Sequence, residues 1–331
     1  MKHYAVAILS GDSDIKEMIA RSWGKKGTST DIALHTLAKP DLMTTIIPLR
    51  YPDKPIPLVL ACHMADVALL PISSKGIDAS VAESAILADV LMMDGIRAVI
   101  AEGGQAYDSF HAQFEKLFKG SPLITWKKET VEPSDLNTLR EDISSLITPM
   151  APSEGGAIIE VDHAFSVQGV GAVILGTILQ GTISKGDRIF AFPGNHQGNV
   201  RSIQVNDIEV KQAGPRTHVG LAIRGILPKN LERGTVLTTA SELIQEVGSF
   251  SGHFRLSPIL PTMADGMKVH VVAGLYDTPA LLKIDDQKDR HAEMHLVMDK
   301  SIPLHSLTKM TILDLNAKQR IIGSLVKSQN E

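Results

Sequence analysis

The residues with the clearest chemical meaning in this 331-residue chain form the loop SGDSDIKE at positions 10–17. The loop follows an apolar run and precedes a run with helical period, which is where many nucleotide-binding folds carry the phosphate loop G-x-x-x-x-G-K-[ST]. In that register the chain has Ser10, Ile15, Lys16 and Glu17 at the defined positions, so only the lysine is kept. Ile15 stands where glycine would let the backbone wrap phosphate. Glu17 replaces the hydroxyl group that would bind Mg²⁺.

Carboxylates are concentrated where the helix after this loop begins. Gly11 is followed by Asp12, and Asp14 precedes Glu17 by three residues, which is the spacing of a capping box. A helix N-terminus attracts anions through its free N–H groups, and here the protein supplies its own anions. Each carboxylate would repel a bound triphosphate by about 1 kcal/mol or more. The loop therefore predicts a capped helix without a nucleotide. The alternative is an altered site in which backbone amides and Lys16 hold the phosphates.

The elements around this loop divide the chain into three parts. Strand-like and helix-period runs alternate over residues 1–150, which predicts an α/β domain with a parallel sheet and helices on both faces. The expected strands are 4–9, 44–49, 64–73, 96–101 and 122–126, and the expected helices are 14–23, 79–93, 107–118 and 134–147. Residues 148–156 have the composition of a linker. Glycine-punctuated strands then predict two small β-barrels, over residues 151–240 and 241–331.

Composition excludes several classes of function. The net charge is −4, with 15 Lys and Arg against 19 Asp and Glu in residues 1–150 and 18 of each in residues 151–331, so nucleic acid would need a local patch and DNA is not expected. The single cysteine, Cys62, excludes a disulfide framework and a cysteine-based zinc cluster. His291 and His295 alternate on one face of an expected strand, so no metal is expected. No apolar run reaches about 18 residues and the start does not read as a signal peptide, which predicts a cytoplasmic protein without a membrane span.

The stretch FSVQGVGAVILG at 165–176 carries the most specific pattern. It matches F-x-V-x-G-x-G-x-V-x-x-G at every position, and VGL at 219–221 and RG at 233–234 follow it. In these signals the chain resembles the first β-barrel of the elongation factor Tu and SelB group of translational GTPases, with the archaeal short SelB-like form as the most similar. The resemblance implies a phosphate-loop GTPase-like domain followed by two barrels.

The resemblance also implies that the first domain is a GTPase with bound GTP and Mg²⁺, yet its motifs depart from the family. The first switch is matched at Gly27, Ser29 and Asp31, with Ser29 where a threonine would touch Mg²⁺. The second switch, D-x-x-G, is replaced by residues 47–50, and Tyr51 stands where the family has its catalytic histidine. Residues 102–105, EGGQ, lack the aspartate of the guanine-reading motif. These losses together predict a pseudo-GTPase with no catalytic residue.

In the family, the first barrel supports the aminoacyl end of tRNA. On this chain the corresponding surface is expected at Phe165, Gly169, Gly171, His218 and Arg224. Three functions remain open: a factor that binds tRNA or a ribosomal partner without cycling GTP, a GTP-binding elongation factor with an altered site, and a protein-binding adaptor outside translation.

Overall fold

A computed structural model describes residues 2–101, 108–148, 155–259 and 263–326. The first domain is built on a seven-stranded sheet in the order β2-β3-β4-β1-β5-β6-β7. Its strands are β1 (His3–Ile8), β2 (Lys25–Ser29), β3 (Ile32–Leu37), β4 (Leu42–Pro48), β5 (Val67–Ile72), β6 (Gly95–Ile100) and β7 (Lys127–Val131). The strands from β4 to β7 in this order run parallel, whereas β2 and β3 form an antiparallel hairpin at the edge. The expected parallel sheet is therefore confirmed, with an antiparallel edge added.

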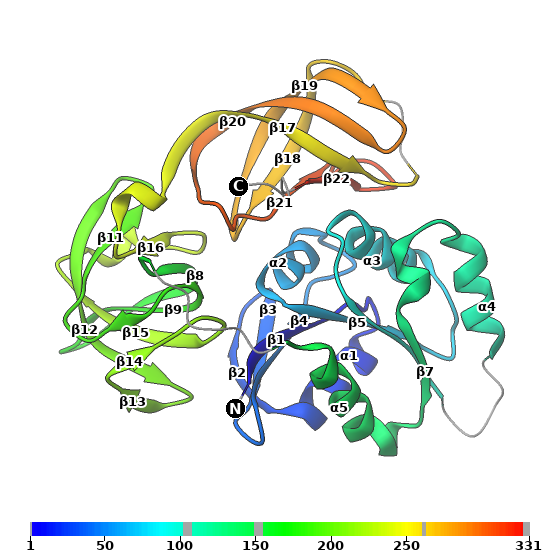
Figure 1. Cartoon of the computed structure of the whole chain (residues 1–331), viewed down its shortest axis with the longest axis horizontal. Helices are drawn as coiled ribbons and strands as arrows, with labels where there is room; N and C mark the ends of the chain where they lie inside the picture. Colours follow the sequence, from blue (N-terminus) through cyan, green and yellow to red (C-terminus); the bar gives the residue numbers. More distant parts are fainter. Residues whose placement is uncertain (1, 102–107, 149–154, 260–262, 327–331) are drawn as a thin grey trace.

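Helices cover both faces of this sheet (Figure 1). The helices α1 (Ser13–Trp23) and α5 (Leu136–Leu146) pack on one face, and the Trp23 indole donates to the Leu136 carbonyl oxygen at 2.8 Å. The helices α2 (Ile56–Met64), α3 (Ala79–Val90) and α4 (Asp108–Leu117) pack on the other face. Short 3₁₀ turns, η1 (Pro122–Thr125) and η2 (Pro133–Asp135), flank β7.

Two details of the sequence-based assignment are corrected. Residues 122–126 were expected to be a strand, but Pro122 starts the 3₁₀ turn η1 with Ser121 as its cap, and the strand follows as β7. Helix α2 was not expected, because almost all of its residues are buried and its sequence shows no amphipathic period.

The second part of the chain is a closed barrel, called barrel 1 here. Its strands are β8 (Ile158–Val167), β9 (Gly171–Gln180), β11 (Arg188–Phe192), β12 (His196–Val205), β15 (His218–Arg224) and β16 (Val236–Thr238), and pairing of β11 with β12 closes it. This part of the chain also contains the smaller strands β10 (Ile183–Ser184), β13 (Ile208–Val210) and β14 (Gln212–Ala213), and the 3₁₀ turns η3 (Pro228–Asn230) and η4 (Ser241–Leu243). Gly169 and Gly171 have φ of 79° and 101°, and a Cβ on Gly176 would lie 2.4 Å from the Glu160 carbonyl oxygen. The motif glycines therefore serve the tight turn and the close strand packing expected of them.

The third part, barrel 2, is a closed barrel in the order β17-β20-β19-β18-β21-β22. Its strands are β17 (Gln245–Leu256), β18 (Met267–Ala273), β19 (Tyr276–Lys288), β20 (His291–Leu304), β21 (Met310–Leu313) and β22 (Ile321–Leu325). The α/β domain followed by two small barrels confirms the predicted fold class. No helix among the described residues is long and apolar enough to cross a membrane.

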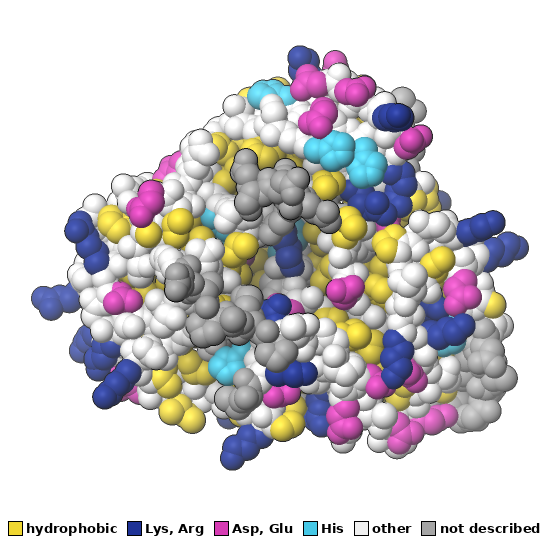
Figure 2. Space-filling view, viewed as in Figure 1, with side chains coloured by type: hydrophobic (Ala, Val, Ile, Leu, Met, Phe, Trp, Pro, Cys, Tyr) yellow, Lys and Arg dark blue, Asp and Glu magenta, His cyan; other side chains and the backbone are white. Residues whose placement is uncertain are grey.

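The three domains meet around a hollow that is visible in Figure 2. A cavity of 310 Å³ at their junction is lined by residues of all three, including Asp66, Glu160, Arg216 and Lys309. These charges are paired within the protein: Arg216 Nε lies 2.9 Å from Asp66 Oδ1, and Lys309 Nζ donates to two carbonyl oxygens of the segment 62–65. Barrel 2 also packs Leu275 and its neighbours into the core formed by α2 and α3.

Candidate functional site

A side chain of the loop after β1 caps the N-terminus of helix α1. Asp12, and not Asp14, caps helix α1, because its carboxylate accepts hydrogen bonds from the amides of Asp14 at 3.1 Å and Ile15 at 3.3 Å. The expected Asp14–Glu17 capping box is therefore wrong: Asp14 lies exposed in the first turn, and Glu17 pairs with Arg21 one turn later. The correction leaves the electrostatic expectation in place, because a carboxylate still occupies the helix N-terminus.

The capping carboxylate is held by a cation from the neighbouring strand end. Lys75, in the loop after β5, places Nζ 2.9 Å from Asp12 Oδ2. Burial would raise the pKa of Asp12, but the Lys75 ammonium and the two helix amides outweigh it and lower that pKa. The Ser10 hydroxyl oxygen accepts a hydrogen bond from the Asp12 amide at 3.1 Å. The Asp12 carboxylate is therefore occupied by two helix amides and by Lys75.

Gly11 lies in close contact with helix α3, which leaves no room for a side chain. A Cβ at this position would lie 2.4 Å from Ser80 Oγ and 3.5 Å from Pro52 Cδ. The loop backbone therefore rests against the first turn of α3 and the segment after β4. A cavity of 500 Å³ remains beside it, with Ser10, Asp12 and Lys75 among its lining residues.

Lys16, the one retained residue of the phosphate-loop pattern, points into the protein. Its side chain is 1% exposed, and Nζ donates to the carbonyl oxygens of Pro48 at 2.7 Å and Tyr51 at 2.8 Å. Burial lowers the pKa of the Lys16 ammonium. In a phosphate loop this ammonium reaches the β- and γ-phosphates. Here it supports the segment that stands where the family has its second switch.

That segment, residues 48–53, is also fixed from two other sides. The Tyr51 hydroxyl donates to the Ser80 carbonyl oxygen at 2.7 Å, and burial raises the pKa of this phenol. Arg320 of barrel 2 donates to the Pro52 carbonyl oxygen at 3.0 Å and forms a bidentate pair with Glu83 of α3. Residues 48–53 therefore join the α/β domain to barrel 2.

The region of the first switch is a hairpin fastened to barrel 1. Ser29 ends β2 and is exposed. Asp31, two residues later, forms a bidentate pair with Arg233, with N–O distances of 2.8 and 2.6 Å. Although burial would raise the pKa of Asp31, the Arg233 guanidinium lowers it to about 2. Thr30 also contacts His163 of barrel 1 at 3.3 Å.

A buried carboxylate organises the facing surface of barrel 1. The Asp162 side chain is fully buried and lies 2.5 Å from His163 Nδ1 and 2.8 Å from His218 Nε2. Burial would lower the pKa of His218, but the Asp162 carboxylate outweighs it and raises that pKa. His218 lines a cavity of 210 Å³ between barrel 1 and the sheet edge, together with Lys25 and Lys26 of β2.

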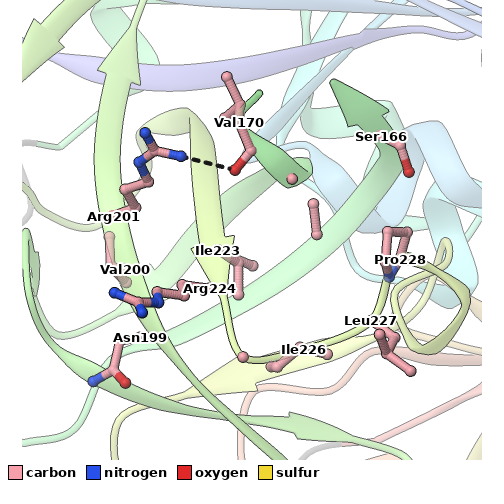
Figure 3. Close-up of a pocket in the computed structure, with 13 residues that line it drawn as sticks. Ser166, Val170, Asn199, Val200, Arg201, Ile223, Arg224, Ile226, Leu227 and Pro228 are labelled. Carbon is pink, nitrogen blue, oxygen red and sulfur yellow. Dashed lines mark hydrogen bonds between the residues drawn. The ribbon is translucent and has the colours of Figure 1, made fainter. Parts of the chain in front are cut away.

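The five residues expected to form one aminoacyl-end surface lie in different places. His218 is in the interdomain cavity just described, whereas Gly171 and Arg224 line a separate pocket of 720 Å³ on barrel 1 (Figure 3). Gly169 lies in the turn beside that pocket, where its carbonyl oxygen accepts a hydrogen bond from Arg201 at 3.2 Å. Phe165 is 45% exposed on β8. Sequence reasoning missed Asp162, Arg201 and Arg233, although Arg233 belongs to a motif that it had singled out.

The other candidates are the histidines of β20, Cys62 and residues 102–105. His291 pairs with His253 at 3.0 Å, whereas His295 pairs with Ser251 at 2.8 Å, so the two histidines of β20 have separate partners. Within the described ranges no group of three or more His, Cys, Asp or Glu residues is arranged to hold a metal ion. Cys62 is buried, and burial raises the pKa of its thiol to about 12. Residues 102–105, expected at the guanine-reading position, lie outside the described part of the chain.

An α/β domain followed by two closed barrels is also the architecture of a solved translation elongation factor, SelB. A family model described as elongation factor Tu domain 2 matches residues 171–238. The chain is a relative of the SelB-like translation factors.

Individual comparisons support this relationship. The selenocysteine-specific elongation factor of Methanocaldococcus jannaschii is 33% identical over 51% of this chain and 36% of its own length, and elongation factor 1-alpha of Picrophilus torridus is 27% identical over 56% and 50%. The matches therefore span half or less of these elongation factors. An uncharacterized protein of M. jannaschii is 27% identical over 93% of this chain and 95% of its own length.

Solved structures show the same fold. Translation elongation factor SelB of Methanococcus maripaludis, in complex with the GTP analogue GppNHp, superposes with a TM-score of 0.86 over 100% of this chain and 80% of that chain, at 19% identity. Its apo form gives a TM-score of 0.82 over 100% of this chain and 81% of that chain, again at 19% identity.

Proposed function

We propose that this protein is a translation-factor relative that binds tRNA without cycling GTP. The observation that carries the proposal is the position of Lys16, whose ammonium is buried and bonded to the carbonyl oxygens of Pro48 and Tyr51. A nucleotide in the loop would not find the Lys16 ammonium directed at its phosphates. To recruit Lys16, it would have to break two hydrogen bonds from a charged donor, each contributing about 1.5–3 kcal/mol.

Electrostatics at the loop support the same proposal. The N–H groups that a phosphate would use at the start of α1 are satisfied by Asp12, which also holds Lys75. A triphosphate would therefore compete with an anion already in place and tethered to the helix. Asp14 adds a further exposed carboxylate in the same turn.

The interdomain cavity beside β2 is the proposed contact for RNA. Lys25 and Lys26 are exposed at its rim, and neither forms an ion pair with a carboxylate among the residues described. His218, whose pKa is raised by Asp162, lines the same cavity. Local cations of this kind fit phosphate contacts, since the net charge of −4 gives no general attraction for RNA.

Two measurements test the proposal. Titration of the full chain with fluorescent GTP and Mg²⁺ should give no saturable binding, and a Kd below about 10 µM would establish the altered GTP site instead. Filter binding of bulk tRNA should weaken as salt rises, with a slope set by the number of phosphates contacted.

The tRNA contact has its own variant and control. The double variant K25A/K26A should reduce that salt slope by about 1–2. The control is K185A, because Lys185 is an exposed lysine that pairs with Glu209 and does not line this cavity. If the native chain, K25A/K26A and K185A all bound tRNA equally, the cavity would be refuted as the RNA site.

A further inference from the structure

The pocket of 720 Å³ on barrel 1 is formed by that barrel alone. Its walls are the turn between β8 and β9, the middle of β12, and the end of β15 leading into η3, that is Val170–Ala172, Asn199–Arg201 and Ile223–Pro228, with Ser166 opposite (Figure 3). Its volume lies within the range of small ligand and side-chain pockets. It shares no lining residue with the loop after β1 or with the cavity proposed for RNA.

Apolar side chains form the floor and part of the rim of this pocket. Ala172, Ile223 and Ile226 are buried beneath it, whereas Val170 is 36% exposed and Leu227 is 58% exposed at its edge. Two exposed aliphatic side chains beside one concave surface can bury further area only against a partner.

Arg201 and Arg224 line this pocket, and Arg188 lies beside it on the neighbouring strand β11. Strand register places Arg188 of β11, Asn199 of β12 and Arg224 of β15 in one row on the outer face, so the two arginines stand about 10 Å apart across the sheet. Arg201 lies two residues farther along β12, and it donates to the carbonyl oxygens of Gly169 and Val170.

Among the described residues these cations have no anionic partner. In the ranges that the structure covers, none of the three arginines forms an ion pair with a carboxylate. Arg188 stacks over the Phe190 ring at 5.3 Å and donates to Gln197, and Arg201 donates to two backbone oxygens. Elsewhere in the protein Arg233, Arg255 and Arg320 each meet a carboxylate.

We infer that this pocket is a docking site for an acidic peptide segment of a partner protein. An aliphatic side chain of the segment fills the pocket between Val170 and Leu227, and flanking carboxylates form bidentate pairs with the arginines. RNA fits less well, because the buried apolar floor and the exposed Val170 and Leu227 side chains match an aliphatic side chain better than a sugar–phosphate backbone.

Fluorescence anisotropy with the full chain tests the inference. The probes are labelled 12-residue peptides with two central leucines flanked by two or three Asp and Glu residues on each side, and matched peptides with Lys replacing the acids. The acidic peptides should bind with a Kd of about 10–100 µM, and the basic ones should not. R224E should weaken acidic-peptide binding at least 10-fold. The control variant K211E, which reverses an exposed charge outside the pocket, should leave binding within 2-fold.

A charge exchange separates docking from misfolding. The double variant R188E/R224E should bind the basic peptides at least 10-fold more tightly than the native chain does, a gain that a damaged barrel cannot give. A labelled single-stranded 12-nucleotide RNA is run in parallel. The inference would be overturned if no acidic peptide bound the native chain at 1 mM. It would also be overturned if the RNA bound the native chain but not R224E, while the peptides bound neither protein.

Discussion

Replacing Lys16 with methionine separates a structural lysine from a phosphate-binding one. Methionine keeps the length of the side chain but removes the ammonium, so the carbonyl oxygens of Pro48 and Tyr51 lose their donor in a buried environment. Hydrogen bonds from a charged donor contribute about 1.5–3 kcal/mol each. Burial of the more apolar methionine offsets part of that loss, so we expect K16M to lower the free energy of unfolding by about 2–4 kcal/mol.

Urea unfolding followed by circular dichroism measures this effect. K54M is the matched control, because Lys54 is exposed, carries the same side chain and directly follows the segment that Lys16 supports. It should change the free energy of unfolding by no more than about 0.5 kcal/mol. A K16M protein as stable as K54M would refute the structural role. So would a wild-type chain that binds GTP and loses this binding in K16M while keeping its stability.

Three further predictions concern the contacts that hold the loop and the domains. Arg233 lowers the pKa of Asp31 to about 2. The Asp31–Arg233 pair therefore stabilises the folded state fully above about pH 4, and this contribution is lost as the pH falls toward 2. Urea unfolding at pH 2–7 should show that D31N loses about 1–2 kcal/mol at pH 7 and that its difference from wild type vanishes near pH 2. D89N, at a fully buried carboxylate that pairs with Arg255, should lower the free energy of unfolding by about 3–5 kcal/mol at neutral pH, and a loss below 1 kcal/mol would contradict this. G11A should cost about 1–3 kcal/mol because its Cβ would meet Ser80, and S80G in the same chain should recover most of that loss in a double-mutant cycle.

The sequence predicted the fold where a local signal sufficed. The alternation of apolar and helix-period runs identified the sheet domain, and the spacing of Gly169, Gly171 and Gly176 identified barrel 1, because each glycine meets a backbone requirement visible in its own turn or strand. Helix α2 was missed since its residues are buried on nearly all sides. The start of η1 was misread because Pro122 follows a capping serine within an otherwise strand-like run.

The site was less predictable because its decisive contacts are not local. The cap was assigned to Asp14 by spacing, but Asp12 takes this role with Lys75, which lies 63 residues away along the chain. The direction of Lys16 depends on acceptors 32 and 35 residues away. The position of His218 depends on Asp162 and on the sheet edge facing barrel 1. No pattern within the loop itself encodes such partners.

The two segments that would respond to a nucleotide are each tied to a barrel by an arginine. The hairpin at the first switch is held by Arg233 of barrel 1 through Asp31, and residues 48–53 are held by Arg320 of barrel 2, which also pairs with Glu83. Both pairs are largely shielded from solvent, so salt screens them less than it would screen surface pairs. Because these contacts are formed by protein side chains and backbone alone, they join the α/β domain directly to both barrels.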